Sequence, residues 1–592
     1  MPAPSPPRRG LGDLLAAPRA LLAAGVLAVV VALPALTLGF VTDDYGFRAM
    51  LRSRAEAAPA AWDLFRFVPR GADVAAAIAA GHLPWWSAPD LAIRFLRPLT
   101  SLLFAADDAV FGDHAVAYHL HSLAWFAALV FAAGAIYRRV LPGPAATVAL
   151  LVFGLSHANV YPYAWVSARH VLAGAVPAAC ALWAHVKDRE DAWRPGRWLA
   201  PVLLAVALAG SEGALAGAAF WIAYDALGPA SIRPDGSPSP ARLAASAPAI
   251  AVAVVYLVVY HLAGGGARSS GGYHDPMAAP LAFAGVALVR VPILLGDALL
   301  GIPAELAVVK PEPAVAVAGL VATMVVGLAA WACRDLVTAS ERAALRWLVP
   351  GAIASTLLGV SGFPGGRVLV LPNLGFAALL GVLLVRGFEA GARRGMRAGL
   401  AVILAVAHLV LAPLSSWRDV AKLGHRARAT EAVARRIEHA AVRHDGRVFL
   451  VASDPLVFLY PRAVLAETAP GTLRCAGVLS AARAGHRVTR LRDRTLAFEP
   501  IERPLLAGSF DTLFRDPHIA FAEGDTFRQC GASIRVAAVA GGLPTRVEVT
   551  FDRPLEDEAI LVWQDHHLER LDPPPLGATE DVAWSPGPSG VL

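Results

Sequence analysis

Two adjacent carboxylates, Asp43 and Asp44, follow the first long apolar stretch of the chain, residues 17–40. A carboxylate at such a position can act as a general base that takes the proton from an attacking hydroxyl group. Two neighbouring acids repel each other, which makes one of them the better proton acceptor, or else they share a divalent cation. A purely structural alternative is that both acids cap a helix that begins near Tyr45.

Basic side chains recur where apolar stretches begin or end. Arg97 precedes Pro98, Arg169 and His170 end the segment WVSARH, and Arg367 stands in the segment GGRVLVLPNLGF. A guanidinium group matches phosphate oxygens in a forked geometry, and a low-dielectric boundary strengthens that contact. Groups of this kind are suited to binding a phosphate. The alternative is that the arginines reach out to lipid headgroups.

Two more polar residues stand in apolar surroundings. Glu212 is the one acid of an apolar hairpin, and His119 stands at the start of an apolar run. An unpaired buried carboxylate is costly, so Glu212 must face a polar cavity, reach the surface or pair with a cation. We count both residues as further polar candidates for the site, although a histidine at a helix entrance is often satisfied by its local neighbours.

The composition places the chain in a membrane. Hydrophobic residues make up 56% and charged residues 17%, and the mean hydropathy is +0.54, against roughly 25% charged residues in a soluble domain. Apolar runs predict about eleven transmembrane helices, at residues 17–40, 117–136, 145–160, 171–185, 198–210, 214–227, 243–262, 314–332, 347–360, 368–385 and 399–414. Residues 281–302 contain Arg290 and Asp297, so we predict an interfacial or re-entrant helix there instead.

Arginine-rich short loops predict the orientation, because such loops stay in the cytoplasm. The loops around Arg138 and Arg139, residues 187–197, Arg233 with Arg242, residues 334–346 and residues 386–397 then share a side with Arg8 and Arg9. An odd number of crossings places the two termini on opposite sides. We predict a cytoplasmic N-terminus over residues 1–16, an extracytoplasmic C-terminus, and an integral protein of the bacterial inner membrane.

The chain changes character after the last apolar run. Residues 415–446 predict a helical linker, and residues 447–592 a small extracytoplasmic α+β or mostly β domain, because short β-like runs alternate there with turn residues. Cys475 and Cys530 would meet an oxidising compartment, where a disulfide is plausible. The first extracytoplasmic loop, residues 41–115, contains Trp62, Trp85 and Trp86, which we expect to anchor at the level of the lipid headgroups.

Five segments occur in a telling order. Asp43-Asp44-Tyr45 follows the first span, and then come FLRPLTSLLFAADDAVFG with AYHLHSL, WVSARH, SEGAL and GGRVLVLPNLGF. Over residues 21–414 the chain resembles the GT-C superfamily of polyprenyl-phosphate-sugar-dependent glycosyltransferases, in particular its protein O-mannosyltransferase-like branch. It departs from that branch in lacking a tetratricopeptide array and in having Ser122 where a His-x-x-Asn motif starting at His119 would place asparagine.

The resemblance implies a GT-C-like catalytic domain over residues 17–414 that transfers a sugar by an inverting mechanism. It implies Asp43 or Asp44 as the base, donor-phosphate binding by Arg97, Arg169, His170 and Arg367, and site roles for His119 and Glu212. The implied partners are a polyprenyl-phosphate-sugar donor, membrane lipid, and a protein, glycan or lipid acceptor, with no nucleic acid. No cofactor is implied beyond a divalent cation that Asp43 and Asp44 could hold.

Two other classes of protein remain open from the sequence. About eleven spans with polar residues on one side could also belong to a transporter or flippase of a lipid-linked solute, although the inverted halves typical of transporters are not visible. An inactive relative that uses its outer domain for binding is the other possibility. Asp565, His566 and His567 are too few ligands to predict a metal site.

Overall fold

The computed structural model describes residues 11–53, 58–229, 243–389, 391, 393–451, 454–508 and 510–588. The chain forms two compact units, each described here by itself. The helical unit comprises residues 1–38, 96–262 and 281–421, and the sheet unit comprises residues 39–95, 263–280 and 422–592. Arg8, Arg9, Arg233 and Arg242, on which part of the predicted orientation rests, lie outside the described residues.

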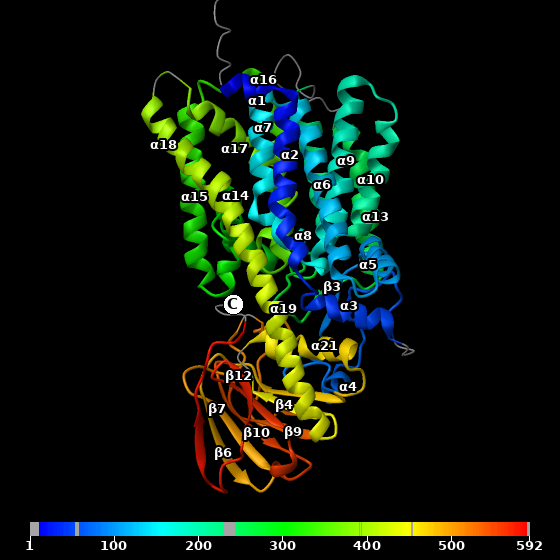
Figure 1. Ribbon diagram of the computed structural model, residues 1–592, viewed down its shortest axis with the longest axis vertical. Helices are drawn as coiled ribbons and strands as arrows, with labels where there is room; N and C mark the ends of the chain where they lie inside the picture. The colour runs from blue at the N-terminus through cyan, green and yellow to red at the C-terminus, as the bar shows by residue number, and fades with distance from the viewer. Residues whose placement is uncertain are drawn as a thin grey trace, which may run out of the picture. The chain divides into compact units, whose positions relative to one another are not determined.

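The helical unit is a bundle in which α2, α6 and α7 pack side by side (Figure 1). Small residues let these helices approach closely. A Cβ atom on Gly154 of α7 would lie 2.5 Å from the Ala28 Cβ of α2, and one on Gly381 of α17 would lie 2.7 Å from the Ala149 nitrogen of α7. The helices are α1 Leu11–Ala16, α2 Pro18–Ala32, α5 Pro98–Phe111, α6 Ala115–Val140, α7 Gly143–Leu155, α8 Val160–Ala164, α9 His170–Asp191, α10 Gly196–Gly210, α11 Leu215–Leu227, α13 Ala247–Leu262, α14 Pro280–Leu300, α15 Glu312–Cys333, α16 Ala339–Leu358, α17 Asn373–Gly387, α18 Arg394–Ala405 and α19 Ala412–Arg443.

All eleven predicted apolar runs are helical, but fewer of them are long enough to cross a membrane. Eight helices of the described residues meet the length and hydropathy expected of a span, and α7 with α8, bent by 48°, would make nine. The helices α10 and α17 have 15 residues each, which is about 22 Å of helix against a hydrocarbon core of about 30 Å.

The prediction against a crossing at residues 281–302 was wrong in its premise. Helix α14 is long and apolar enough to span, and its two charged side chains do not face lipid. Arg290 is buried and donates to the Gly362 carbonyl oxygen at 2.8 Å, while Asp297 is buried beside His157. Charges that have partners inside the protein no longer exclude the helix from the membrane.

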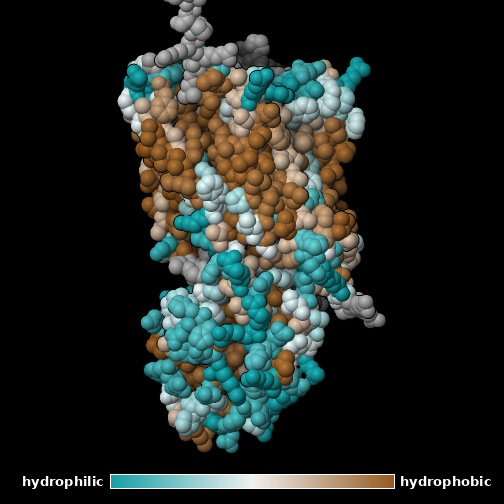
Figure 2. All heavy atoms as spheres, in the orientation of Figure 1, coloured by the Kyte–Doolittle hydropathy of each residue, from teal (hydrophilic) through white to brown (hydrophobic). Residues whose placement is uncertain are grey.

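The exposed surface of the helical unit is apolar, as membrane helices require. On the face that Figure 2 shows, hydrophobic side chains cover most of the helical unit, whereas hydrophilic ones predominate on the sheet unit. On α13, for example, Val254, Val255, Val258 and Val259 are all about half exposed. In water such a surface would be a large unfavourable exposed patch, so the chain is an integral membrane protein.

The sheet unit confirms the predicted C-terminal domain and extends it. Its two larger sheets have the strand orders β13-β6-β7-β10-β9-β8, antiparallel throughout, and β12-β11-β4-β5, in which β4 pairs in parallel with both neighbours. A third sheet has the order β1-β2-β3. The elements are α3 Asp43–Arg52, β1 Arg66–Val68, α4 Val74–Ala79, β2 Ala92–Arg94, β3 Gly266–Arg268, β4 Arg447–Val451, α20 Pro455–Phe458, α21 Pro461–Thr468, β5 Cys475–Ser480, β6 His486–Arg492, β7 Thr495–Pro500, β8 Thr526–Gln529, β9 Ala532–Ala540, β10 Leu543–Thr550, β11 Ile560–Gln564, β12 His567–Arg570 and β13 Thr579–Val582.

The first loop contributes to the core of the sheet unit, which corrects the expected headgroup anchoring of two tryptophans. Trp85 and Trp86 are fully buried, and the Trp85 Nε1–H donates to the Leu479 carbonyl oxygen at 3.2 Å. Trp62, by contrast, is 47% exposed. Burial of a large aromatic ring contributes more free energy than an interfacial position when the folded chain offers an apolar pocket.

A disulfide joins Cys475 of β5 to Cys530 at the turn after β8, a pairing that the sequence left open. The first loop lies directly against it: Gly81 has a φ of +68°, and a Cβ there would come within 2.9 Å of both sulfur atoms. The Cys530 N–H also donates to the Ala79 carbonyl oxygen at 3.0 Å. The bond therefore stabilises the place where the first loop and the C-terminal domain meet.

We expect the double substitution Cys475→Ser and Cys530→Ser to lower the stability of the sheet unit by about 4 kcal/mol, because the bond closes a loop of 55 residues. Thermal unfolding of the purified protein with and without reductant measures this effect. The control is Cys180→Ser, which removes a free thiol and should leave the melting temperature unchanged. An equal response of the double variant and the wild type to reductant would contradict the prediction.

Candidate functional site

The adjacent acids Asp43 and Asp44 are the first two residues of helix α3 in the sheet unit. Asp43 is its first residue and is half-buried, while Asp44 is completely buried and accepts a hydrogen bond from the Val41 N–H at 2.9 Å. The helix starts two residues before Tyr45, where sequence reasoning placed its beginning. Both acids therefore stabilise a helix start, and the base and capping roles are compatible.

Side chains of helix α3 that follow the two acids are paired with residues of α19 and α21. The Tyr45 hydroxyl donates to Glu431 Oε1 at 2.6 Å, and the buried Arg48 guanidinium forms an ion pair with Glu467 at 2.7 Å. Arg48 also lies 3.9 Å over the Phe40 ring. These contacts fix the first turn of α3, and rigid support of this kind is what a positioned catalytic carboxylate needs.

In the helical unit, two predicted site residues pair with each other. Arg97, the residue before α5, donates from Nε and Nη2 to the two carboxylate oxygens of Glu212, with Nε 2.8 Å from Oε2. Burial alone would raise the pKa of Glu212, but the charge and hydrogen bonds of Arg97 outweigh it, so the pKa lies below its usual value. Glu212 is therefore ionised, and of the three alternatives that the sequence left open the structure shows pairing with a cation, Arg97.

His170 joins this pair at the start of α9. Its Nδ1 lies 3.3 Å from the hydroxyl of Ser211, the residue before Glu212, and the charges of Arg97 and Arg367 both act on its ring. The fold thus gathers Arg97, His170, Glu212 and Arg367 into one polar cluster, here called the cationic cluster. Each member stands at a helix end, where the chain leaves the apolar interior.

Arg367 differs from the other arginines of the candidate site. It is half-buried, and within the part of the chain that the structure describes its guanidinium forms no hydrogen bond or ion pair. Its short helix, η8 Gly366–Leu369, precedes α17. A guanidinium group that keeps its donors available is suited to bind phosphate oxygens.

Arg169, by contrast, is fully engaged inside the protein. Its Nε donates to the Ser122 hydroxyl at 2.8 Å and its Nη2 to the Tyr118 carbonyl oxygen at 2.7 Å, while Nη1 forms an ion pair with Asp107. Sequence reasoning missed Asp107, although the segment FLRPLTSLLFAADDAVFG contains it. Ser122 does have a polar partner, so the serine that replaces asparagine still contributes to this network.

We expect Arg169→Ala to destabilise the protein by about 3 kcal/mol, because it removes the arginine partner of the buried Asp107 carboxylate and leaves it only His121, whose Nδ1 lies 2.7 Å from Asp107 Oδ1. The measurement is the melting temperature in detergent, compared with that of Arg367→Ala. Arg367 has no such partner among the described residues, so its variant should melt as the wild type does. Equal melting of all three proteins would show that the Asp107 pair adds nothing to stability.

His119 of α6 is completely buried, so the structure places it in the interior of the helical unit.

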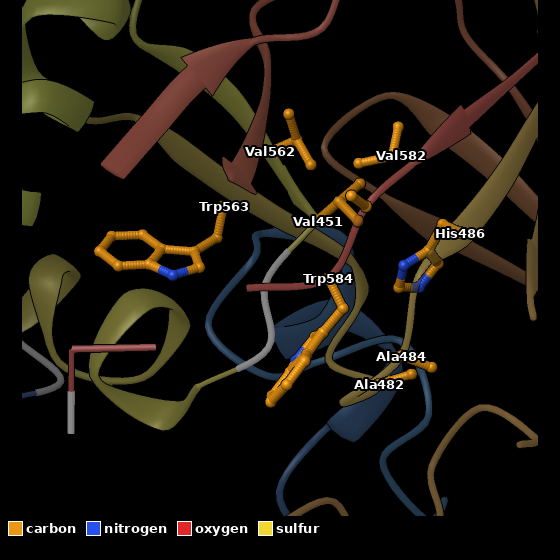
Figure 3. Close-up of a pocket in the computed structure, with 9 residues that line it drawn as sticks. Val451, Ala482, Ala484, His486, Val562, Trp563, Val582 and Trp584 are labelled. Atoms are coloured by element: carbon orange, nitrogen blue, oxygen red, sulfur yellow. The ribbon is translucent and has the colours of Figure 1, made fainter. Parts of the chain in front are cut away.

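A separate pocket lies in the sheet unit, lined by Val451, Trp563, Trp584 and His486 among others (Figure 3). Burial lowers the pKa of His486 to about 4, so the ring is neutral at physiological pH. This pocket has no charged lining residue and does not suit a phosphate.

Comparisons with known proteins give similarity of structure only. No protein-family model matches the chain, and no curated protein matches it. An oligosaccharyltransferase from Archaeoglobus fulgidus, in the apo form, aligns at a TM-score of 0.41 with 11% identity over 75% of this chain and 64% of its own length. ArnT from Cupriavidus metallidurans, bound to undecaprenyl phosphate, aligns at 0.37 with 15% identity over 78% and 89%. The chain spans less than two thirds of the length of the archaeal protein.

Proposed function

We propose that this chain is an extracytoplasmic glycosyltransferase of the bacterial inner membrane that takes its sugar from a polyprenyl phosphate. The observation that carries the proposal is Arg367 of the cationic cluster. Its guanidinium is half-buried and has no hydrogen bond or ion pair among the described residues, and the same cluster contains Arg97 and His170. The order of the five sequence segments supports the same class of reaction. The acceptor is a hydroxyl group of a protein, glycan or lipid.

The reaction is a single displacement with inversion at the anomeric carbon. The acceptor oxygen attacks that carbon, the bond from carbon to the phosphate oxygen breaks, and polyprenyl phosphate leaves. Asp43 or Asp44 takes the proton of the acceptor hydroxyl. Arg367, Arg97 and His170 stabilise the charge on the leaving phosphate, and Glu212 orients Arg97 through its paired hydrogen bonds. Arg169 supports this region through Ser122 and Asp107.

The test is a transfer assay with purified protein, a radiolabelled polyprenyl-phosphate sugar and a panel of membrane extracts as acceptors. Release of the lipid carrier together with label in an acceptor supports a transferase. Movement of label across a proteoliposome membrane without carrier release would indicate a transporter or flippase instead. Donor binding with neither outcome would indicate an inactive relative, and both of these results would overturn the proposal.

A further inference from the structure

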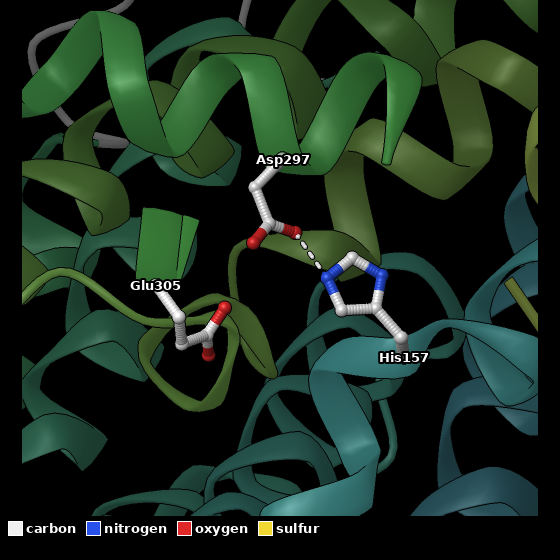
Figure 4. A group of neighbouring side chains, drawn as sticks. All are labelled: His157, Asp297 and Glu305. Atoms are coloured by element: carbon white, nitrogen blue, oxygen red, sulfur yellow. Dashed lines mark ion pairs between the residues drawn. The ribbon is translucent and has the colours of Figure 1, made fainter. Parts of the chain in front are cut away.

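Three side chains of types that can ligate a metal ion meet inside the helical unit. His157 stands in the short helix η2 His157–Asn159 between α7 and α8, Asp297 near the end of α14, and Glu305 in η6 Ala304–Val308. One ligand atom from each lies within 4.8 Å of the other two, and His157 Nε2 is 3.1 Å from Asp297 Oδ1. Figure 4 shows the three side chains pointing toward one another.

The backbone around these side chains holds both carboxylates in place. The Ala304 N–H donates to Asp297 Oδ2 at 2.9 Å, and the Gly366 N–H donates to Glu305 Oε1 at 2.8 Å. A Cβ atom on Gly366 would lie 3.1 Å from the Ala158 Cα and 3.6 Å from Asp297 Oδ2. The close approach of these segments therefore needs a small residue at position 366.

The two facing atoms have only each other as a polar partner, whereas buried polar atoms normally form regular hydrogen bonds. His157 Nε2 and Asp297 Oδ1 are both buried and form an ion pair at 3.1 Å, and among the described residues neither atom forms a hydrogen bond with a third group. In the same part of the chain, no lysine or arginine pairs with Asp297 or Glu305. His157 is thus the one basic side chain that pairs with these two carboxylates among the described residues, and it carries at most one positive charge. The excess negative charge in a buried place is costly, and a bound divalent cation would offset it.

We propose that His157, Asp297 and Glu305 bind one divalent transition-metal ion, with zinc the preferred one. Zinc accepts both histidine nitrogen and carboxylate oxygen, and zinc sites that keep a fourth position open have three protein ligands, whereas calcium and magnesium take oxygen ligands. Two ligand atoms of a tetrahedral zinc ion at about 2.1 Å lie roughly 3.4 Å apart, close to the 3.1 Å between His157 and Asp297.

The site has a direct consequence for the segment that carries Arg367. Gly366 donates its N–H to Glu305 and precedes Arg367 in η8, so a bound ion fixes the backbone from which this arginine extends. His157, Asp297 and Glu305 are in this sense positioning residues for Arg367. Metal binding itself does not rest on the proposed glycosyltransferase function, and it is measured without any substrate.

The experiment uses the full-length protein without a polyhistidine tag, stripped with EDTA and titrated with zinc. We expect about one zinc per chain by elemental analysis, a higher melting temperature with zinc, and visible absorption bands when cobalt replaces it. Glu305→Gln, at a half-buried position that should tolerate the change, is expected to weaken zinc binding at least about tenfold. His157→Gln with Asp297→Asn should abolish the cobalt bands.

The chain offers a matched control in a second buried His–Asp pair. His185 Nε2 lies 3.0 Å from Asp225 Oδ1, but Asp225 also accepts a hydrogen bond from Ser246 and lies near Arg189. His185→Gln should leave zinc content and affinity unchanged. If the wild type binds no zinc, if Glu305→Gln binds it equally well, or if only magnesium or calcium binds, the proposal fails. A protein that binds zinc but transfers no sugar would refute only the proposed function.

Discussion

Asp43→Asn or Asp44→Asn, whichever removes the base, is expected to lower sugar transfer by about 100-fold or more, because a general base contributes about 10²–10⁴ to the rate. The fold should survive both changes. Asp44 accepts a hydrogen bond from the Val41 N–H, and the carbonyl oxygen of an asparagine can accept the same bond. We therefore expect unchanged melting temperatures and membrane insertion, with the loss confined to kcat in the radiolabelled assay.

A matched control for these variants is Asp73→Asn. Asp73 caps helix α4 of the same unit by accepting the Ala76 N–H at 2.9 Å, and asparagine caps a helix about as well as aspartate. This variant should keep full activity. Normal transfer by both single variants and by the double variant Asp43→Asn, Asp44→Asn would remove the proposed base. Loss in only one single variant would identify which carboxylate accepts the proton.

Arg367→Ala is expected to weaken use of the donor by about 10- to 100-fold in kcat/KM, since a hydrogen bond to a charged group contributes about 1.5–3 kcal/mol. Arg367 has no competing hydrogen bond or ion pair among the described residues, so its removal disturbs binding rather than folding. Kinetics with varied donor and fixed acceptor, and the reverse, measure the two effects separately. Arg367→Lys should restore part of the loss by returning the charge.

The control for Arg367 is Arg346→Ala. Arg346 is an exposed residue of α16 in a segment predicted to be cytoplasmic, and its loss should change neither donor nor acceptor kinetics. An equal effect of Arg367→Ala on donor and acceptor use would contradict a phosphate role. A lower melting temperature of Arg367→Ala would instead indicate a structural role, like the one argued for Arg169.

Local sequence predicted the elements well, because each depends on nearby residues. The apolar runs became helices, the charged linker became part of α19, and residues 447–592, where short β-like runs were predicted, contain strands such as β4, β9, β10 and β11. The number of spans was less accurate. Runs such as residues 198–210 were counted as spans although they are short, and α10 and α17, with 15 residues each, fall below the length that a crossing needs.

The site was predicted as a set of residue types, and the structure distinguished their roles. Arg97, Arg169 and Arg367 look alike in the sequence, at the edges of apolar runs. In the folded chain Arg97 pairs with Glu212, Arg169 with Asp107, and Arg367 with neither a carboxylate nor a carbonyl group of the described residues. Partners that stand more than 60 positions away decide which of the three is available to a ligand.

The sequence by itself determined that this is a membrane protein with a folded C-terminal domain, because transfer of apolar segments out of water is a local property. Only the tertiary structure decided that Trp85 and Trp86 enter the core of the sheet unit, and that His157, Asp297 and Glu305 share one place. Those three residues come from segments up to 148 positions apart. Proximity of that kind depends on how helices pack, which no spacing along the chain reveals.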